Sequence, residues 1–204
     1  MKKLFVISSA SCFEGEVALI NALFDAGMQV FHFRKPGISA AAHSEILAGI
    51  DPKFHNMVVL HQFHEHGLEL GMHRFHFSER ERHELSSREV ALPADRVDCT
   101  TNGVYSTSVH ALVEDDELLK DYHYAFFGPI YDSISKKDYR AMELGDFKLP
   151  AHHKKKLVAI GGIAPHNIER VFDMGFDKAA ILGALWSKPA QTLDVFEQLK
   201  RKCE

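Results

Sequence analysis

The stretch of sequence that decides the fold runs from residue 157 to residue 183 and reads LVAIGGIAPHNIERVFDMGFDKAAILG. It begins with an apolar run, Leu157–Ile160, which has the length of a buried strand. A helical pattern follows over Pro165–Met174, Gly175 is placed to end that helix, and a second, mostly apolar run occupies Lys178–Leu182. A strand, a helix and a second strand in this order predict a parallel βαβ unit.

The same alternation extends through the rest of the chain. Further strands are expected at Leu4–Ser8, Val30–Phe33, Met57–His61, Arg74–Phe77, within Val97–Ser106, and at Tyr124–Phe127. Helices are expected at Val17–Ala26, Ile38–Ile50, Phe63–Leu70, His110–Lys120 and Thr192–Lys200, and Ser78–Ser87 is expected to be a polar helix or a loop. Eight strands, each followed by a helical or polar segment, predict an α/β fold, a single (β/α)8 TIM barrel in one domain over residues 1–204.

The alternative fold is an open, doubly wound sheet. Such sheets commonly begin with a glycine-rich turn, G-x-G-x-x-G, after the first strand. The corresponding segment here, Ser8–Gly15, lacks this motif. We therefore favour the barrel.

Composition excludes several classes of protein. The 204 residues carry 24 Lys and Arg against 28 Asp and Glu, a formal net charge of -4, so we expect no nucleic-acid partner. The three cysteines lie far apart in the sequence, which indicates a reducing compartment. The apolar run at Leu4–Ile7 is too short for a signal peptide, and no run approaches the roughly 18 apolar residues of a membrane span. We expect a cytoplasmic protein with no membrane partner.

Small residues follow the last two predicted strands. Gly161-Gly162 comes after the seventh strand, and Gly183-Ala184 comes after the eighth. The loops after these two strands commonly hold a phosphate group in TIM barrels, and glycines leave backbone N–H groups free to approach an anion. The alternative is that these are ordinary turn glycines.

Two further places carry groups suited to phosphate. Residues 128–150 form a long polar connection after the sixth strand, in which Ser133, Ser135 and Lys136 offer two hydroxyl groups and a positive charge. Arg34, beside Lys35, stands at the end of the second strand, where a guanidinium group can bind phosphate through two donors. The alternatives are a solvated loop and a surface ion pair.

Together these motifs resemble the thiamine-phosphate synthase family and its thiazole tautomerase relatives, over nearly the whole chain. The most specific stretch is GPIYDSISKKD at 128–138, which is similar to the family's G-P-[IV]-[FY]-x-T-x-T-K loop with serines for threonines. Residues 158–163 are similar to the strand 7 motif, and residues 108–110 to the S-x-H motif. His32-Phe33-Arg34 occupies the place of the family's Q-x-R. The resemblance implies a TIM barrel and possible assembly as a homodimer.

The resemblance also implies an activity, in which the enzyme joins a hydroxymethylpyrimidine diphosphate to a thiazole phosphate and releases pyrophosphate in thiamine biosynthesis, with Mg2+ as cofactor. By position in the family's motifs, the diphosphate side would be held by Arg34, Ser133, Ser135 and Lys136, together with His32. Gly162, Leu182 and Gly183 would hold the thiazole phosphate. Arg34, Lys136 and Ser108 would take part in catalysis, with Ser108 near the transferring centre.

The sequence departs from the family at its metal site. The segment that carries a metal-binding carboxylate after strand 3 is His61-Gln62-Phe63 here, and the second carboxylate aligns with Glu81 or its neighbour Glu79. Two alternative functions therefore stay open, a thiazole phosphate tautomerase and a non-catalytic binder of thiazole or thiamine phosphates.

The chain contains 14 histidines, many of them in residues 61–83. Their spacing permits Zn2+ or Ni2+ ligation. A general acid or base at the barrel mouth, supplied by His32, His61 or His110, is the preferred interpretation, because histidine titrates near neutral pH.

Overall fold

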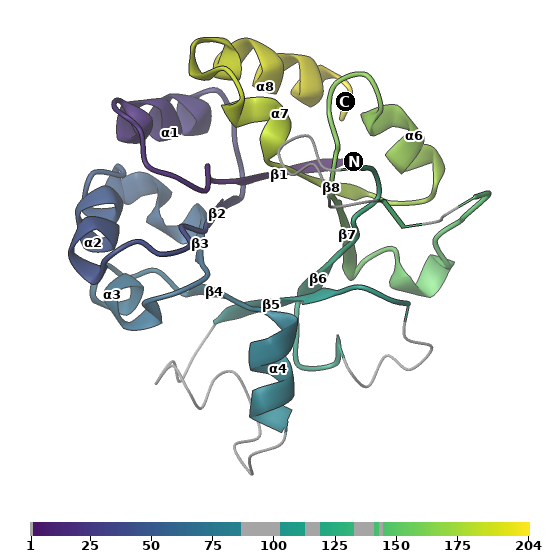
Figure 1. Ribbon diagram of the computed structural model, residues 1–204, viewed down its shortest axis with the longest axis horizontal. Coiled ribbons are helices and arrows are strands. Elements are labelled where there is room, and N and C mark those ends of the chain that lie inside the picture. Colours follow the sequence, from purple (N-terminus) through teal and green to yellow (C-terminus); the bar gives the residue numbers. More distant parts are fainter. Residues whose placement is uncertain (1, 87–102, 113–118, 133–140, 143–144) are drawn as a thin grey trace.

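Eight parallel strands close into a barrel in the order of the sequence, as the computed structural model of the chain shows in Figure 1. It describes residues 2–86, 103–112, 119–132, 141–142 and 145–204. The strands are β1 (Lys3–Ile7), β2 (Phe31–Phe33), β3 (Val58–Leu60), β4 (Arg74–Phe77), β5 (Val104–Val109), β6 (Tyr124–Phe127), β7 (Leu157–Ile160) and β8 (Lys178–Ile181). The predicted (β/α)8 barrel is confirmed.

Helices surround this barrel on the outside (Figure 1). The α-helices are α1 (Glu16–Asp25), α2 (Ala40–Ala48), α3 (His64–Glu69), α4 (Glu79–Ser86), α6 (Ile168–Asp173), α7 (Gly183–Trp186) and α8 (Thr192–Arg201). Short 3-10 helices are η1 (Pro52–Met57), η3 (Ala151–His153) and η4 (Pro189–Gln191). The sequence predicted that Met57 begins the third strand. In the structure Met57 is the last residue of η1, and β3 begins at Val58.

The fifth strand is the element that the sequence located least well. We expected it within residues 97–106, and β5 instead runs from Val104 to Val109. Residues 97–102, and residues 113–118 of the helix expected after this strand, lie outside the described residues. The observed strand carries Ser106 and Ser108, two residues apart, on the same face.

The barrel has an apolar shell outside its strands and a partly polar interior. Alternate residues of a strand point to opposite faces, so Phe31 and Phe33 of β2 pack against the helices while His32 points inward, where its ring contacts Phe5 and Phe126. The interior cluster on the side of β1, β6, β7 and β8 is aromatic and aliphatic: Phe5, Ile7, Tyr124, Phe126, Val158 and Ala180. On the opposite side, β2 and β4 contribute buried histidines.

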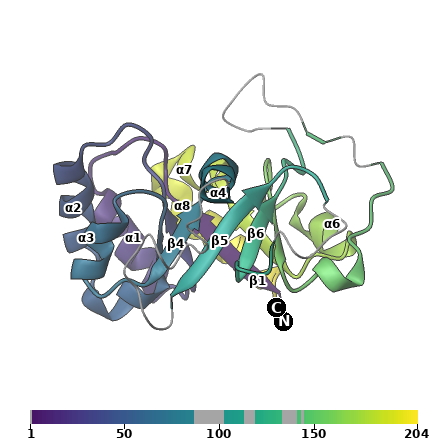
Figure 2. The same ribbon diagram turned by 90° about the horizontal axis from the view of Figure 1, so that it is seen from below.

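Seen from the side, the two chain termini lie together at the end of the barrel where β1 begins (Figure 2). The other end is the one at which all eight parallel strands finish. Among the described residues, no helix combines the length and the apolar character that crossing a membrane requires.

Candidate active site at the carboxyl ends of the strands

A cavity of about 530 Å³ opens at the carboxyl ends of the strands. Every strand contributes to its wall, either with its own last residues or with the residue that follows: Ile7, Arg34, His61, His76, Ser108, Phe126, Ile160 and Ala180. A volume of this size suits a small organic ligand. The carboxyl end of the strands is also where TIM barrels place their active sites.

The structure brings five of the predicted site residues to this one cavity, namely Arg34, Ser108, Gly162, Leu182 and Gly183. His32 lies directly behind the wall, fully buried, with its ring in contact with that of Phe126. Ser133, Ser135 and Lys136 lie outside the described residues. Glu81 is described, and it does not belong to the wall.

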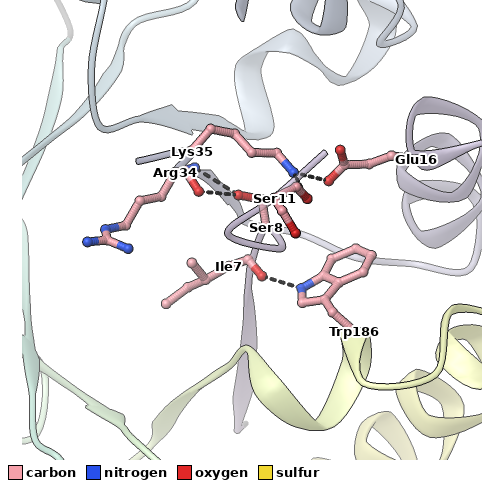
Figure 3. A network of polar contacts seen from close by, with 7 residues as sticks. All are labelled: Ile7, Ser8, Ser11, Glu16, Arg34, Lys35 and Trp186. Carbon is pink, nitrogen blue, oxygen red and sulfur yellow. Dashed lines mark hydrogen bonds and ion pairs between the residues drawn. The ribbon is translucent and has the colours of Figure 1, made fainter. Parts of the chain in front are cut away.

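Arg34 is held by contacts of its main chain and of its neighbour. The Ser8 hydroxyl group accepts a hydrogen bond from the Arg34 N–H at 2.9 Å and donates to the Arg34 carbonyl at 2.8 Å. The next residue, Lys35, is buried and donates to the carbonyl of Ser11 and to the carboxylate of Glu16. Figure 3 shows the two side chains pointing in opposite directions, so only the arginine reaches the cavity.

The loop after β8 is tied to β1 by the same network. The indole N–H of Trp186, on α7, donates to the Ile7 carbonyl at 2.6 Å (Figure 3). Helix α7 begins at Gly183, which lines the cavity, and Ile7 lines it as well. This hydrogen bond therefore fixes the position of one wall against another.

A chain of hydrogen bonds connects the cavity with the barrel interior. Nδ1 of His32 lies 2.9 Å from Nε2 of His61, which is half-buried in the wall. Nε2 of His32 lies 2.8 Å from the hydroxyl oxygen of Tyr124. A buried tyrosine and a buried histidine thus orient a histidine that faces the cavity.

A third imidazole stands beside this chain. His76 stacks on His61 with ring centroids 4.1 Å apart. Its Nδ1 lies 2.9 Å from the Ser106 hydroxyl, and its Nε2 lies 3.1 Å from the Ser108 hydroxyl. The two inward-facing serines of β5 therefore hold one ring at both nitrogens.

All three histidines are neutral at pH 7. Burial lowers the pKa of His32 well below 6.5, and repulsion from a protonated His76 and from the charge of Arg74 lowers it further. Burial, followed by the charges of His76, His32 and Arg34, has the same effect on the pKa of His61. For His76, burial and then the charge of Arg34 lower the pKa to about 3. Neutral rings are able to accept a proton or ligate a metal ion.

The glycines after β7 permit a close approach between two loops. Gly161 and Gly162 have φ angles of 104° and 61°, in the left-handed region that favours glycine. A Cβ atom on Gly161 would stand 2.6 Å from Cα of Pro129, and one on Gly162 would collide with the carbonyl oxygen of Asp132. Glycine is therefore required at both positions by packing, and both residues also line the cavity.

The carboxylates near the mouth divide between two roles. Glu81 accepts hydrogen bonds from the N–H and hydroxyl group of Ser78 at 2.7 and 2.6 Å, which is a capping box at the start of α4. Glu79 lines the cavity, 3.2 Å from Nη2 of Arg82 and 3.7 Å from Nε2 of His110. Among the described residues of the wall, Glu79 is the one carboxylate.

This carboxylate, which is paired with Arg82, would hold Mg2+ only together with substrate oxygens and water. Mg2+ is often held by one or two carboxylates together with substrate phosphates and water. The side chain of Gln62 donates to the Lys35 carbonyl at 3.0 Å and does not belong to the wall. The residues present therefore fit a metal ion for which Glu79 would supply one ligand and the bound substrate most of the others.

Ser106 and Tyr124 are parts of this site that motif reasoning did not single out. Both lie on strands with a period-two alternation, and counting back from Ser108 and from Phe126 places them on the interior face. This alternation is the sequence signal from which Ser106 and Tyr124 could have been assigned to the site.

Comparisons with known proteins agree with this geometry. The family model described as thiamine monophosphate synthase matches residues 4–185. A thiamine-phosphate synthase of Anoxybacillus flavithermus is 27% identical over 216 aligned residues, which cover 98% of this chain and 91% of that protein. The crystal structure of thiamine phosphate pyrophosphorylase from Bacteroides thetaiotaomicron superposes with a TM-score of 0.74 at 27% identity, over 99% of this chain and 97% of the other. The Pyrococcus furiosus thiamine phosphate pyrophosphorylase, at 18% identity, a TM-score of 0.72 and coverage of 98% and 95%, shows the same fold.

Proposed function

This chain belongs to the thiamine monophosphate synthase family, and from that premise we propose that it joins a hydroxymethylpyrimidine diphosphate to a thiazole phosphate and releases pyrophosphate. The observation that carries the proposal is the convergence of Arg34, Ser108, Gly162 and Gly183 on one cavity at the carboxyl ends of the strands. The proposed function is compatible with the cytoplasmic location that the cysteine usage predicts. Assembly as a homodimer stays a prediction from the family.

In the proposed reaction, the bond between the pyrimidine methylene carbon and the diphosphate oxygen breaks, and the electron pair leaves with pyrophosphate. The thiazole nitrogen then forms a bond to that carbon. The guanidinium group of Arg34 is suited to bind the diphosphate, because charge-assisted contacts to phosphate are the strong kind. We assign Ser133, Ser135 and Lys136 to the same group and Ser108 to the transferring centre. Backbone groups of Gly162, Leu182 and Gly183 are assigned to the thiazole phosphate.

Magnesium is part of this proposal. Glu79 would hold Mg2+ together with the diphosphate, and the ion would supply charge neutralisation to the leaving group. The residues around it have the task of placing the two substrates in line. Arg34, which lines the same cavity after β2, would act on the diphosphate as well.

The test is an incubation with both substrates, with and without Mg2+, followed by chromatography for thiamine phosphate. We expect product that depends on Mg2+ and on both substrates. Absence of thiamine phosphate at every Mg2+ concentration would overturn the proposal. Binding of thiazole phosphate without turnover would then identify a non-catalytic binder.

A second candidate, thiazole phosphate tautomerase, is favoured by one observation. His61 faces the cavity and is linked through His32 to Tyr124, at 2.9 and 2.8 Å. Such a chain orients an imidazole for proton transfer, as a buried partner does for the histidine of a hydrolase triad. Exchange of a ring-bound proton of the thiazole phosphate with deuterium oxide, followed by NMR, would support this function. Loss of exchange in His61→Gln, with thiazole phosphate still bound, would assign it to the chain.

A further inference from the structure

Three imidazoles from consecutive strands converge behind the cavity: His32 from β2, His61 directly after β3, and His76 from β4. One ring nitrogen of each lies within 4.8 Å of the others. One pair, Nδ1 of His32 and Nε2 of His61, is 2.9 Å apart. Because Zn–N bonds are about 2.0–2.1 Å long, the ligands of a tetrahedral ion stand about 3.3–3.4 Å from one another. One pair is therefore closer than this spacing, and no pair is more than 4.8 Å apart.

From this geometry we propose that His32, His61 and His76 bind one divalent transition-metal ion of the class that prefers imidazole ligands, such as Zn2+ or Co2+. The site goes beyond the proposed function, since Mg2+ would be held at Glu79 by oxygen atoms. Mg2+ prefers carboxylate, carbonyl and water oxygens, whereas imidazole suits Zn2+ and Co2+. The two sites therefore differ in the ions they accept.

The protonation state of the cluster favours a metal ion. A histidine ligates through a neutral ring, and burial keeps all three rings neutral at pH 7. The short contact between His32 and His61 needs one proton between two lone pairs. A metal ion can replace that proton between Nδ1 of His32 and Nε2 of His61 if the proton moves to the other nitrogen of the His61 ring and this half-buried ring rotates.

The groups behind the ligands also match a metal site. A ligating histidine usually bonds a second group through its other nitrogen, which fixes the ring and its tautomer. For His32 that group is the hydroxyl of Tyr124, at 2.8 Å. His76 has a serine hydroxyl at each nitrogen, Ser106 at 2.9 Å and Ser108 at 3.1 Å, so it keeps one partner whichever nitrogen turns to the ion.

The position of the cluster indicates an open coordination site. His61 and His76 both line the cavity, so a fourth position on the ion would face the ligand space. Three protein ligands with one open position are the pattern of catalytic zinc sites. Arg34 lines the same cavity as His61 and His76, so its positive charge opposes that of the ion. Removal of Arg34 should therefore tighten metal binding.

The test uses the full chain, stripped with a chelator, and the metal alone. We expect calorimetry to detect one tight Zn2+ per chain, and Co2+ to give the intense visible absorption of a tetrahedral ion. His61→Gln should weaken Zn2+ binding about a hundredfold or more, since one of three ligands is lost. The matched control, His166→Gln, removes an exposed histidine outside the cluster and should bind Zn2+ like the wild type. Arg34→Ala should bind Zn2+ more tightly than the wild type.

Equal Zn2+ affinity in the wild type and in folded His61→Gln, or a pale octahedral Co2+ spectrum, would overturn the proposal. If His61→Gln does not fold by circular dichroism, Tyr124→Phe decides instead. It removes the hydroxyl group that bonds His32 and Ser106 and leaves all three ligands in place. About a tenfold to hundredfold loss of Zn2+ affinity is expected, whereas unchanged affinity would overturn the site. Because no substrate is present, the result is independent of thiamine phosphate formation.

Discussion

The hydroxyl group of Ser8 is bonded to both main-chain groups of Arg34, as acceptor from its N–H at 2.9 Å and as donor to its carbonyl at 2.8 Å. Ser8 follows β1 and Arg34 follows β2, so the two bonds continue the pairing of these strands beyond their last residues. The Ser8 N–H also donates to the His32 carbonyl at 2.9 Å. The direction in which Arg34 leaves the barrel therefore depends on a buried serine.

Replacing this serine tests its role. Ser8→Ala removes both bonds and leaves two main-chain groups without their partner, so the free energy of unfolding should fall by about 1–3 kcal/mol. Urea denaturation measures this change. Ser8→Thr, which retains a hydroxyl group, should recover most of the loss. An unchanged urea midpoint in Ser8→Ala would mean that the two bonds do not hold the strand ends.

Arg34→Ala tests the phosphate assignment. Loss of a charge-assisted contact should weaken binding of the pyrimidine diphosphate by about 1.5–3 kcal/mol, roughly tenfold or more, and affect the thiazole phosphate much less. Lys136→Ala is expected to behave in the same way. Calorimetry with each ligand measures the difference, and Arg201→Ala, on the exposed face of α8, serves as control. Equal losses for the two ligands would refute the assignment.

The buried ion pair between Lys35 and Glu16 gives a prediction about stability. Both side chains are almost fully buried, so Lys35→Met leaves an unpaired carboxylate and should lower the free energy of unfolding by about 3–5 kcal/mol. The double variant Lys35→Met/Glu16→Leu removes both charges and should recover most of that loss. Denaturation of the wild type, of Lys35→Met, of Glu16→Leu and of the double variant gives the coupling free energy between the two side chains. A double variant as unstable as the single one would show that packing, and not charge, dominates here.

Alanine substitutions at two glycines with positive φ angles, Gly37 and Gly162, distinguish the cost of backbone strain from the cost of a steric collision. At Gly37, with φ of 78°, a Cβ atom meets nothing within 4 Å, and Gly37→Ala should cost about 1–2 kcal/mol of stability. At Gly162 the same change adds collisions with the Asp132 carbonyl and with Cβ of Tyr131, at 2.7 Å. Gly162→Ala should therefore be clearly less stable than Gly37→Ala in thermal unfolding. Equal melting temperatures would contradict the close packing of the loops after β6 and β7.

His43 predicts a pH dependence. Its ring is fully buried between Phe33 and Phe63, and neither ring nitrogen has a hydrogen-bond partner among the described residues. Burial, with smaller effects from His66 and His64 against Glu65, lowers its pKa to about 4. The folded state thus binds fewer protons than the unfolded state between pH 6.5 and 4, and stability falls as the pH is lowered.

His43→Phe removes this term. The fall in the free energy of unfolding from pH 7 to pH 5 should be smaller in the variant by roughly 2 kcal/mol. Urea denaturation at the two pH values measures it, with His166→Gln as the exposed control. The same fall in variant and wild type would show that His43 is charged in the folded protein.

The sequence predicted the strands best where they are apolar on both faces. β7, between an apolar shell and an apolar interior, is a continuous apolar run, and its bounds were predicted as Leu157–Ile160. β5 was placed too early because its later residues include serines. The alternation of the strand points these serines inward, and His76, on the neighbouring strand, supplies their hydrogen-bond partner. A pattern within one segment does not contain the partner that makes a polar interior residue acceptable.

The same reasoning explains the uneven prediction of the site. Arg34, Ser108, Gly162 and Gly183 follow strand ends, and a barrel brings all strand ends together. Glu81 was assigned to a metal, yet Ser78 and Glu81 also have the spacing of a capping box, a local signal that the structure displays. The contact of His32 with His61 and His76 depends on the register of β2, β3 and β4, which spacing along the chain does not give.

The hydrogen bond between Trp186 of α7 and Ile7 of β1 gives the protein an intrinsic fluorescent probe of its cavity. Trp186 is the single tryptophan of the sequence, and its indole is bonded to Ile7 in the cavity wall and lies 6.0 Å from the ring of Phe13. All indole emission therefore originates beside the site, three residues after the cavity-lining Gly183. A ligand that shifts either wall changes the surroundings of this one fluorophore, so occupancy of the cavity can be followed by intrinsic fluorescence without any added label.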